Sequence, residues 1–249
     1  MLLAKGHRVL ATHRTELDSA NPETVSEFCR RVPAGTSILH SVPLVRNGHA
    51  WLPPTEALAP LLERAARIVY LSTTGVYGAQ THVDENTVPA PRTARETMRV
   101  DEERRVRELC PSTLILRPAA IYGPGRGVHV SLRNGTHRLW GNGANYISRI
   151  YVDDLAALCA AALQAELGGA YPVADETPCQ AREITEFCAS LLGVAAPAPT
   201  GRLPEDDTRS ANRQVDGRAI RRLLGVELRH KSYQTGILAA LEAERLKRD

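Results

Sequence analysis

The chain has 249 residues, of which 43% are hydrophobic and 24% charged, and its formal net charge is +3. This length fits one large α/β domain, and so small a net charge gives no indication of nucleic-acid binding. No run of residues is apolar enough to span a membrane, and the opening residues MLLAKGHR are charged too early for a secretory leader, so we expect a cytoplasmic protein. The five cysteines form no CxxC pair, and no metal-ligand spacing is present, so we expect no metal site.

Short β-branched runs alternate along the chain with longer amphipathic runs, which is the pattern of a mostly parallel sheet covered by helices. Strands are expected at residues 7–12, 37–42, 68–72, 113–117 and 171–174. Helices are expected at residues 55–66, 93–109, 152–165, 182–192, 217–224 and 234–247. Residues 195–207 are rich in Pro, Ala and acidic residues and predict a surface loop.

The most informative stretch is IVYLSTTGVYG at residues 68–78, where an apolar strand ends in three consecutive hydroxyl residues and a glycine turn. Hydroxyls at the carboxyl end of a parallel strand stand in the crevice where open α/β sheets bind ligands. Such a hydroxyl can donate a hydrogen bond to a substrate carbonyl. Taken alone, the stretch is equally compatible with a strand exit whose hydroxyls only satisfy local backbone groups.

Further segments follow in a fixed order. They are LILRPAAIYGPGR at 114–126, SRIYVDDL at 148–155, GGAYPVADETP at 168–178 and VDGRAIRRLLG at 215–225. Together with residues 68–78, they resemble the extended short-chain dehydrogenases, in particular the atypical branch that is similar to NAD-dependent epimerases and dehydratases. The resemblance spans most of the chain.

The resemblance implies a Rossmann-like, mostly parallel sheet with flanking helices, incomplete at the N-terminus, plus a small C-terminal substrate-side part. It implies that residues 1–249 form a single NAD(P)-binding domain, with substrate-side elements mainly within 125–150 and 168–249. It also implies a small-molecule substrate, either a nucleotide sugar or another polar carbonyl compound, and a homodimer to which the helix at 93–109 contributes.

Site residues carry over from the resemblance position by position. Thr73 falls on the family's catalytic Ser/Thr, with Thr74 beside it. The cofactor-binding positions are Ser41, Val42 and Pro43 near the adenine ribose, Ser72, and Pro118, Ala119, Ala120 and Ile121 along the nicotinamide. Asn145 and Arg149 fall on the substrate side, where a loop-forming role is the alternative. Arg14 follows the expected strand at 7–12, a position where arginine favours NADP over NAD; the alternative is an ordinary solvent-exposed charge.

The helix at 93–109 departs from the family pattern. The family's general acid is a Tyr four residues before a Lys, and anchoring on Glu103 places Arg95 and Arg99 at these positions. No Tyr lies between Tyr77 and Tyr122, and no Lys between Lys5 and Lys231. A guanidinium does not deprotonate in proteins, so Arg95 is no proton donor, whereas Arg99 can keep the positive charge and the ribose contact. The alternative for both arginines is a solvated helix face.

The N-terminal part departs as well. The family's glycine-rich turn, which brings backbone N–H groups against a pyrophosphate, is missing from the sequence. The first residues resemble the end of the helix that follows this turn, and residues 17–25 resemble a segment that lies further along in the family. We therefore expect that the first strand lies upstream of Met1, in a truncated reading frame or natural fragment; the alternative is that another segment replaces this strand. We also expect that a helix and most of a strand before residue 17 are deleted.

The leading hypothesis is an NAD(P)-dependent epimerase, dehydratase or reductase relative whose activity is weak or lost. The alternative is a non-catalytic relative that binds a small ligand or a protein. A nucleophilic hydrolase is disfavoured because no G-x-S-x-G elbow is present.

Overall fold

A four-stranded parallel sheet forms the centre of the computed structural model, which describes residues 3, 6–13, 15–47, 50–201 and 211–247. The strands are β1 (Ser37–His40), β4 (Arg67–Leu71), β6 (Thr113–Pro118) and β11 (Gly169–Val173), in the spatial order β1-β4-β6-β11. Ser37 pairs with Arg67, Ile68 with Thr113, and Gly169 with Leu114. Every residue of β6 is buried, as expected for a strand with neighbours on both sides and helices on both faces.

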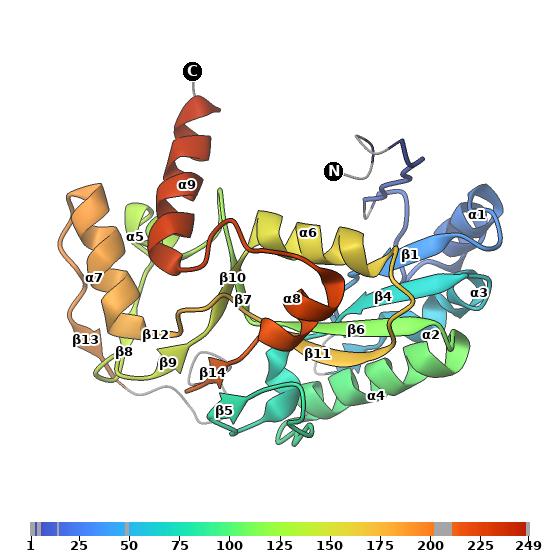
Figure 1. Cartoon of the computed structure of the whole chain (residues 1–249), viewed down its shortest axis with the longest axis horizontal. Coiled ribbons are helices and arrows are strands. Elements are labelled where there is room, and N and C mark those ends of the chain that lie inside the picture. The colour runs from blue at the N-terminus through green and yellow to red at the C-terminus, as the bar shows by residue number, and fades with distance from the viewer. Residues whose placement is uncertain (1–2, 4–5, 14, 48–49, 202–210, 248–249) are drawn as a thin grey trace.

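Helices cover the two faces of this sheet (Figure 1). On one face, α4 (Ala94–Leu109), α1 (Pro22–Arg31) and the short helices α2 (Pro54–Ala57) and α3 (Ala59–Leu62) pack around the side chains of Ile68 and Tyr70. On the other face, α6 (Val152–Ala162) and α8 (Arg218–Leu224) pack on Val69 and Leu114. The alternation of Ile68, Val69 and Tyr70 between the two cores follows from the two-residue period of a strand.

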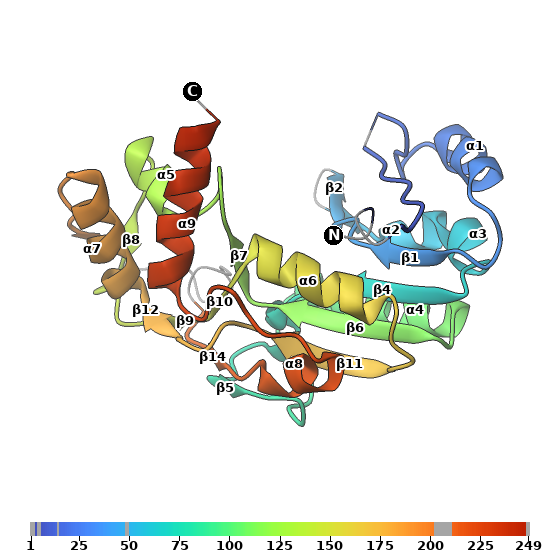
Figure 2. The same cartoon turned by 45° about the horizontal axis from the view of Figure 1, so that its top comes forward.

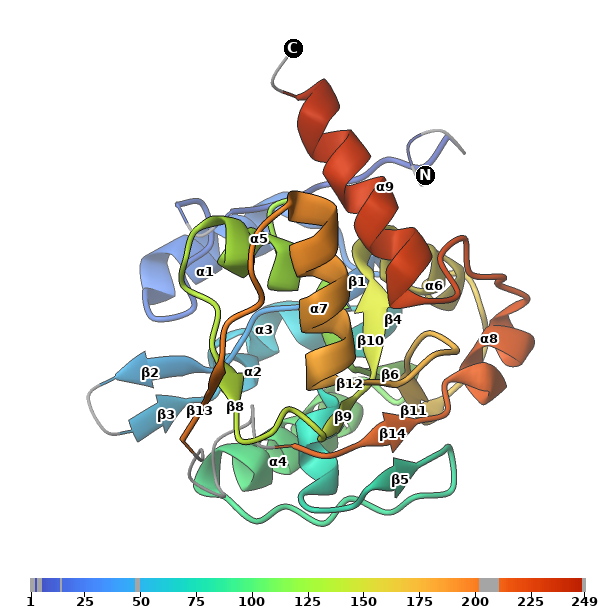
Figure 3. The ribbon, with the colours of Figure 1, turned by 90° about the vertical axis from the view of Figure 1, so that its left-hand side faces the viewer.

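A smaller lobe lies beyond the carboxyl ends of the strands (Figures 2 and 3). It contains α5 (Val128–Arg133), α7 (Ala181–Leu192) and α9 (Tyr233–Leu246), which enclose a separate apolar core with Tyr122, Ile184 and Ile237 at its centre. The 3₁₀ helix η2 (Thr74–Tyr77) connects β4 to the loops at this end.

Short strands pair in twos around the two lobes. These pairs are β2 (Val45–Asn47) with β3 (Ala50–Leu52), β5 (His82–Val83) with β14 (Gln214–Val215), β7 (Ala120–Tyr122) with β10 (Arg149–Tyr151), β8 (Leu139–Trp140) with β13 (Pro199–Thr200), and β9 (Tyr146–Ile147) with β12 (Cys179–Gln180). The β7–β10 pair is parallel and leads from the sheet into the smaller lobe.

The predicted α/β fold with a mostly parallel sheet is confirmed, and four of the expected strands form within a few residues of their predicted bounds. The strand expected at residues 7–12 is wrong: these residues are irregular, and Val9 and Leu10 are 43% and 49% exposed. A strand needs a neighbour for its backbone N–H and C=O groups, and the free edge of β1 does not pair with this segment in the described structure. The sequence analysis missed α1 and α5.

Helix ends follow ordinary capping chemistry. Thr93 and Glu96 form a reciprocal capping box at the start of α4, in which the Thr93 hydroxyl accepts from the Glu96 N–H and the Glu96 carboxylate accepts from the Thr93 N–H. Among the helices that the described residues form, none has the length and apolar character to cross a membrane.

Candidate functional site at the carboxyl edge of the sheet

The carboxyl ends of the parallel strands bring most of the predicted cofactor residues to one edge of the sheet. Residues 41–43 follow β1, residues 72–74 follow β4, and residues 118–121 end β6 and enter β7. Because the strands are parallel and adjacent, these three segments lie next to one another. Ser41, Pro43 and Ala120 are exposed, while Pro118 and Ala119 are buried.

The three hydroxyl residues after β4 have different surroundings. The Ser72 side chain is buried, and its Oγ has no hydrogen-bond partner in the described structure. Thr73 is partly exposed, and its Oγ1 accepts a hydrogen bond from the N–H of Gly75 at 3.1 Å, which caps η2. Thr74 is buried. Thr73 is therefore the most accessible of the three hydroxyls, and Ser72 is the one with unused hydrogen-bonding capacity.

A buried ion pair between Arg117 and Glu103 supports the η2 turn that follows Thr73. The Arg117 guanidinium donates to both carboxylate oxygens of Glu103, with Nε–Oε1 and Nη2–Oε2 distances of 3.0 and 2.6 Å. Its Nη1 donates to the hydroxyl of Tyr77, the last residue of η2, at 3.0 Å. The bonds to Glu103 outweigh burial and raise the pKa of Arg117. The pair thus ties α4 to β6 and holds the turn that carries Thr73.

Arg99 points into the core between α4 and β4 and is only 8% exposed. Its Nη1 donates to the hydroxyl of Tyr70 at 2.8 Å, while its Nε has no partner in the described structure. Burial raises the pKa of Tyr70 to about 12, although the neighbouring Arg99 charge acts in the opposite direction. Arg99 is therefore not on a solvated helix face, which overturns that alternative for this residue.

Arg95 lies one turn earlier on α4, and its side chain is exposed to solvent on one side. Its guanidinium carbon lies 5.4 Å from the centre of the Trp51 ring, which belongs to β3 of the β2–β3 hairpin. This is a cation–π arrangement. The two arginines at 95 and 99 thus have separate environments, one on the hairpin and one in the core.

A buried polar network that the sequence analysis did not identify stands beside Arg99. His40 Nε2 lies 3.2 Å from Thr55 Oγ1, and that hydroxyl donates to Glu102 at 2.6 Å. Burial, and secondarily the charge of Arg99, lowers the pKa of His40 to about 4, so its imidazole is neutral at pH 7. Burial also raises the pKa of Glu102. No local sequence signal indicated this network, because its members lie on three separate elements.

The two predicted substrate-side residues are engaged within the smaller lobe. Asn145 Nδ2 donates to the carbonyl of Ala211 at 2.9 Å. Arg149 is 6% exposed, and its Nη1 donates to the carbonyl of Ile147 at 2.8 Å and contacts Cys179 Sγ at 3.0 Å. Both side chains therefore organise loops in the structure as it stands. Arg14 lies outside the described residues.

The model of the NAD dependent epimerase/dehydratase family matches residues 1–174. The chain belongs to this family.

Solved structures similar to this family member cover nearly all of the chain. A functionally unknown conserved protein from Silicibacter pomeroyi shares 29% identity over 99% of this chain and 92% of its own, with a TM-score of 0.76. A dTDP-glucose 4,6-dehydratase from Streptomyces venezuelae, solved with NAD bound, shares 19% identity over 93% of this chain and 79% of its own, with a TM-score of 0.75.

An ADP-L-glycero-D-manno-heptose-6-epimerase from Helicobacter pylori shares 16% identity over 92% of this chain and 78% of its own, with a TM-score of 0.73. At these identities, the two enzymes establish a shared fold and no more. The comparison with curated proteins gives no match.

A nicotinamide dinucleotide fits this family member at one end only. The unpartnered Ser72 hydroxyl and the partly exposed Thr73 hydroxyl supply hydrogen-bonding capacity at the edge, and Ala120 there is small and exposed. For a pyrophosphate, the described residues before β1 supply neither a strand nor a glycine-rich turn. The described edge therefore offers hydroxyl groups to a cofactor but no cradle for its pyrophosphate.

Proposed function

We propose that the chain binds NAD or NADP at the carboxyl edge of its sheet and turns over a nucleotide-sugar-like or other polar carbonyl substrate weakly or not at all. The observation that carries the proposal is the engagement of Arg99. In the family pattern a Lys at this position serves the Tyr four residues earlier, and here a buried guanidinium is bonded to Tyr70 instead.

The roles that we propose for the chain's own residues follow from their positions. The Thr73 hydroxyl donates a hydrogen bond to a substrate carbonyl, Thr74 supports it, and residues 118–121 line the nicotinamide. Ser72 supplies a hydroxyl to the ribose, and residues 41–43 pass the far end of the cofactor. Arg99 provides positive charge behind this edge. When bound, the cofactor would supply hydride transfer.

Proton transfer is the step that we propose to be deficient. Arg95 has no proton to give near neutral pH, because guanidinium groups do not deprotonate in proteins. The tyrosines near the edge do not replace a catalytic Tyr, since Tyr70 and Tyr77 are fully buried and their pKa values are raised by burial. A general acid should have a pKa near the working pH.

The test combines binding and turnover with the purified chain. Calorimetric titration with NADH and NADPH should give heat of binding, and Ser72→Ala should weaken it, with Ser112→Ala at the opposite end of the sheet as a control. Turnover with nucleotide-sugar substrates should stay far below the 1 to 10³ s⁻¹ that is usual for enzymes. A rate within that range would refute the proposed loss of activity, and absence of any binding would refute the cofactor site.

Substitutions on α4 distinguish a missing proton donor from the use of substrates that the protein does not accept. Arg95→Tyr with Arg99→Lys should raise turnover above that of the unaltered chain if cofactor binds, whereas Arg105→Tyr with Arg104→Lys on the exposed face should not. Cofactor binding without turnover in all variants would favour the non-catalytic alternative. Comparing NADPH with NADH for Arg14→Ala tests the proposed preference for NADP.

A homodimer through α4 and a location in the cytoplasm also belong to this proposal. The exposed face of α4 carries ion pairs between Arg104, Arg105 and Glu108, which a partner would have to accommodate. Light scattering of the purified chain and microscopy of a tagged chain test these two points.

A further inference from the structure

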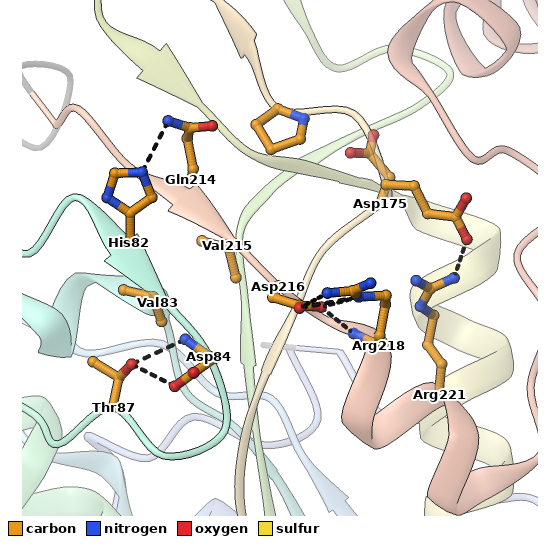
Figure 4. A pocket seen from close by; sticks show the side chains of 12 residues that line it. His82, Val83, Asp84, Thr87, Asp175, Gln214, Val215, Asp216, Arg218 and Arg221 are labelled. Atoms are coloured by element: carbon orange, nitrogen blue, oxygen red, sulfur yellow. Dashed lines mark hydrogen bonds and ion pairs between the residues drawn. The ribbon is translucent and has the colours of Figure 1, made fainter.

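A cavity of about 500 Å³ lies beside the carboxyl end of β11 (Figure 4). Its walls come from three distant segments: β5 with the turn after it, the residues that follow β11, and β14 with the start of α8. None of the individual residues predicted to bind cofactor or substrate lines it, although eight of its twelve lining residues lie within 168–249, a range predicted to hold substrate-side elements. Its volume is in the range of small-molecule sites.

The charges around this cavity do not balance. Four carboxyl groups and two guanidinium groups line it. Arg218 pairs with Asp216 at 2.6 Å, and Arg221 pairs with Glu176 at 2.7 Å. Each guanidinium group is thereby paired with a carboxylate, and neither Asp84 nor Asp175 forms an ion pair within 4 Å among the described residues, although the charges of Arg149 and Arg221 act on Asp175. An anionic ligand would meet no free positive group here, whereas a cation would meet two carboxyl groups.

Asp175 is the unusual member of this set. It is 2% exposed, and its Oδ1 accepts from the N–H of Thr177 at 3.2 Å, while Oδ2 has no hydrogen-bond partner. Buried polar atoms are normally hydrogen-bonded, and an unpaired one costs free energy. In Figure 4 the carboxyl groups of Asp175 and Asp84 stand on opposite sides of the cavity.

The wall next to Asp175 is tightly built. A Cβ at Gly217 would lie 2.6 Å from the backbone nitrogen of Ala174. The backbone just before α8 therefore packs directly against the backbone that follows β11. The buried side chains of Val83 and Val215 supply an apolar part of the lining. The cavity thus combines a fixed acceptor, a second carboxylate and a small apolar surface.

We propose that this cavity binds a small alkyl amine, whose ammonium group donates hydrogen bonds to Asp175 and whose carbon chain lies on Val83 and Val215 toward Asp84. A primary ammonium supplies three donors for oxygen acceptors. A quaternary ammonium would instead need aromatic rings, and no Trp, Tyr or Phe occurs among the described residues that line the cavity. The site is independent of the proposed cofactor function.

The test uses isosteric probes at pH 8, namely n-butylamine, n-butanol and butyrate, together with 1,4-diaminobutane. Calorimetry should show binding of both amines, with the diamine tighter because it reaches Asp84, and no binding of the alcohol or the acid. Asp175→Asn should weaken amine binding by about tenfold or more, since it removes a hydrogen bond to a charged group. Asp101→Asn on the exposed face of α4 serves as the control and should change nothing.

A second variant and a second pH keep the test decisive if Asp175→Asn does not fold. Asp84→Asn retains the oxygen that accepts from Thr87 and should weaken the diamine more than the monoamine. Burial raises the pKa of Asp175 to about 7, so amine affinity should fall about tenfold between pH 8 and pH 6 as the carboxylate is protonated. The charged and titratable groups around Asp175 are Arg149 on β10, Tyr122 on β7, Asp154 on α6, Arg221 on α8 and Cys179 on β12.

Equal binding of alcohol and amine, or absence of amine binding, would overturn the proposal. Amine binding that Asp175→Asn leaves unchanged would overturn it as well, because the ammonium would then sit elsewhere.

Discussion

Glu103→Leu should be among the most damaging single substitutions in the chain. It removes both acceptors of the Arg117 guanidinium, whose Nε and Nη2 then stay buried without partners, while only the bond to Tyr77 remains. The side chains of Arg117 and Glu103 are 7% and 3% exposed, so water does not replace the lost acceptor. Breaking a buried pair from one side costs about 3–5 kcal/mol. For a chain of this size, that corresponds to a fall in Tm of about 6–20 °C.

Urea unfolding followed by circular dichroism measures this loss, and two further variants isolate its cause. Glu103→Leu with Arg117→Met replaces the whole pair by apolar side chains and should recover most of the stability, because no buried charge is left alone. Glu108→Leu on the same helix breaks ion pairs of a side chain that is 45% exposed and should cost less than about 1 kcal/mol. A Glu103→Leu variant as stable as Glu108→Leu would refute the assignment of the pair as a buried support of the Thr73 turn.

Three further outcomes are expected. Gly236→Ala should lower the free energy of unfolding by about 1–3 kcal/mol despite the better helix propensity of alanine, because a Cβ would overlap the Tyr122 hydroxyl and lie 2.7 Å from Tyr122 Cε2. Tyr122→Phe removes that hydroxyl and should partly restore the stability in thermal melts. Glu244, whose pKa is lowered to about 2 chiefly by hydrogen bonds from Gly125, Arg133 and His129 that outweigh burial, contributes stability that is present above about pH 4.5 and lost as the pH falls toward 2. Urea titrations at several pH values should show a loss of up to about 3 kcal/mol that Glu244→Gln lacks. Asp175 behaves in the opposite sense: its raised pKa means that stability falls as the pH rises from about 4 to 7, so Asp175→Asn should gain on the unaltered chain across this range.

Local signals were sufficient for much of the fold. The expected helix at 93–109 differs from α4 by one residue, because Thr93 and Glu96 form a capping box that is visible in the sequence. The buried strands β4 and β6 were found from their apolar runs. The missed helix α1 also carries a signal: Asn21 caps it, Pro22 stands in its first turn, and Val25, Phe28 and Cys29 share its buried face. These signals together are sufficient to predict a helix that begins at Pro22.

Other features depend on tertiary contacts that no local pattern contains. Residues 7–12 have the composition of a strand, but a strand forms only when it pairs with another, and in the described structure these residues do not pair with the open edge of β1. Arg99 is buried against Tyr70 because α4 packs closely on β4, and no feature of the helix sequence predicts this contact. The cavity next to Asp175 combines residues from three segments that lie more than thirty positions apart in sequence, and only the folded chain brings them together.

The parallel arrangement of β1, β4, β6 and β11 also has a kinetic consequence. Parallel neighbours cannot be joined by a tight hairpin. During folding each strand must therefore pair with residues far along the chain, as Ser37 does with Arg67 and Ile68 with Thr113. Each pairing closes a long loop before it gains any contact energy, which makes refolding slow. Meanwhile the outer edge of β1, where Leu39 is 41% exposed, pairs with no other strand of the described residues, so its backbone groups are open to another extended chain. Recovery after dilution from urea should therefore decline with protein concentration.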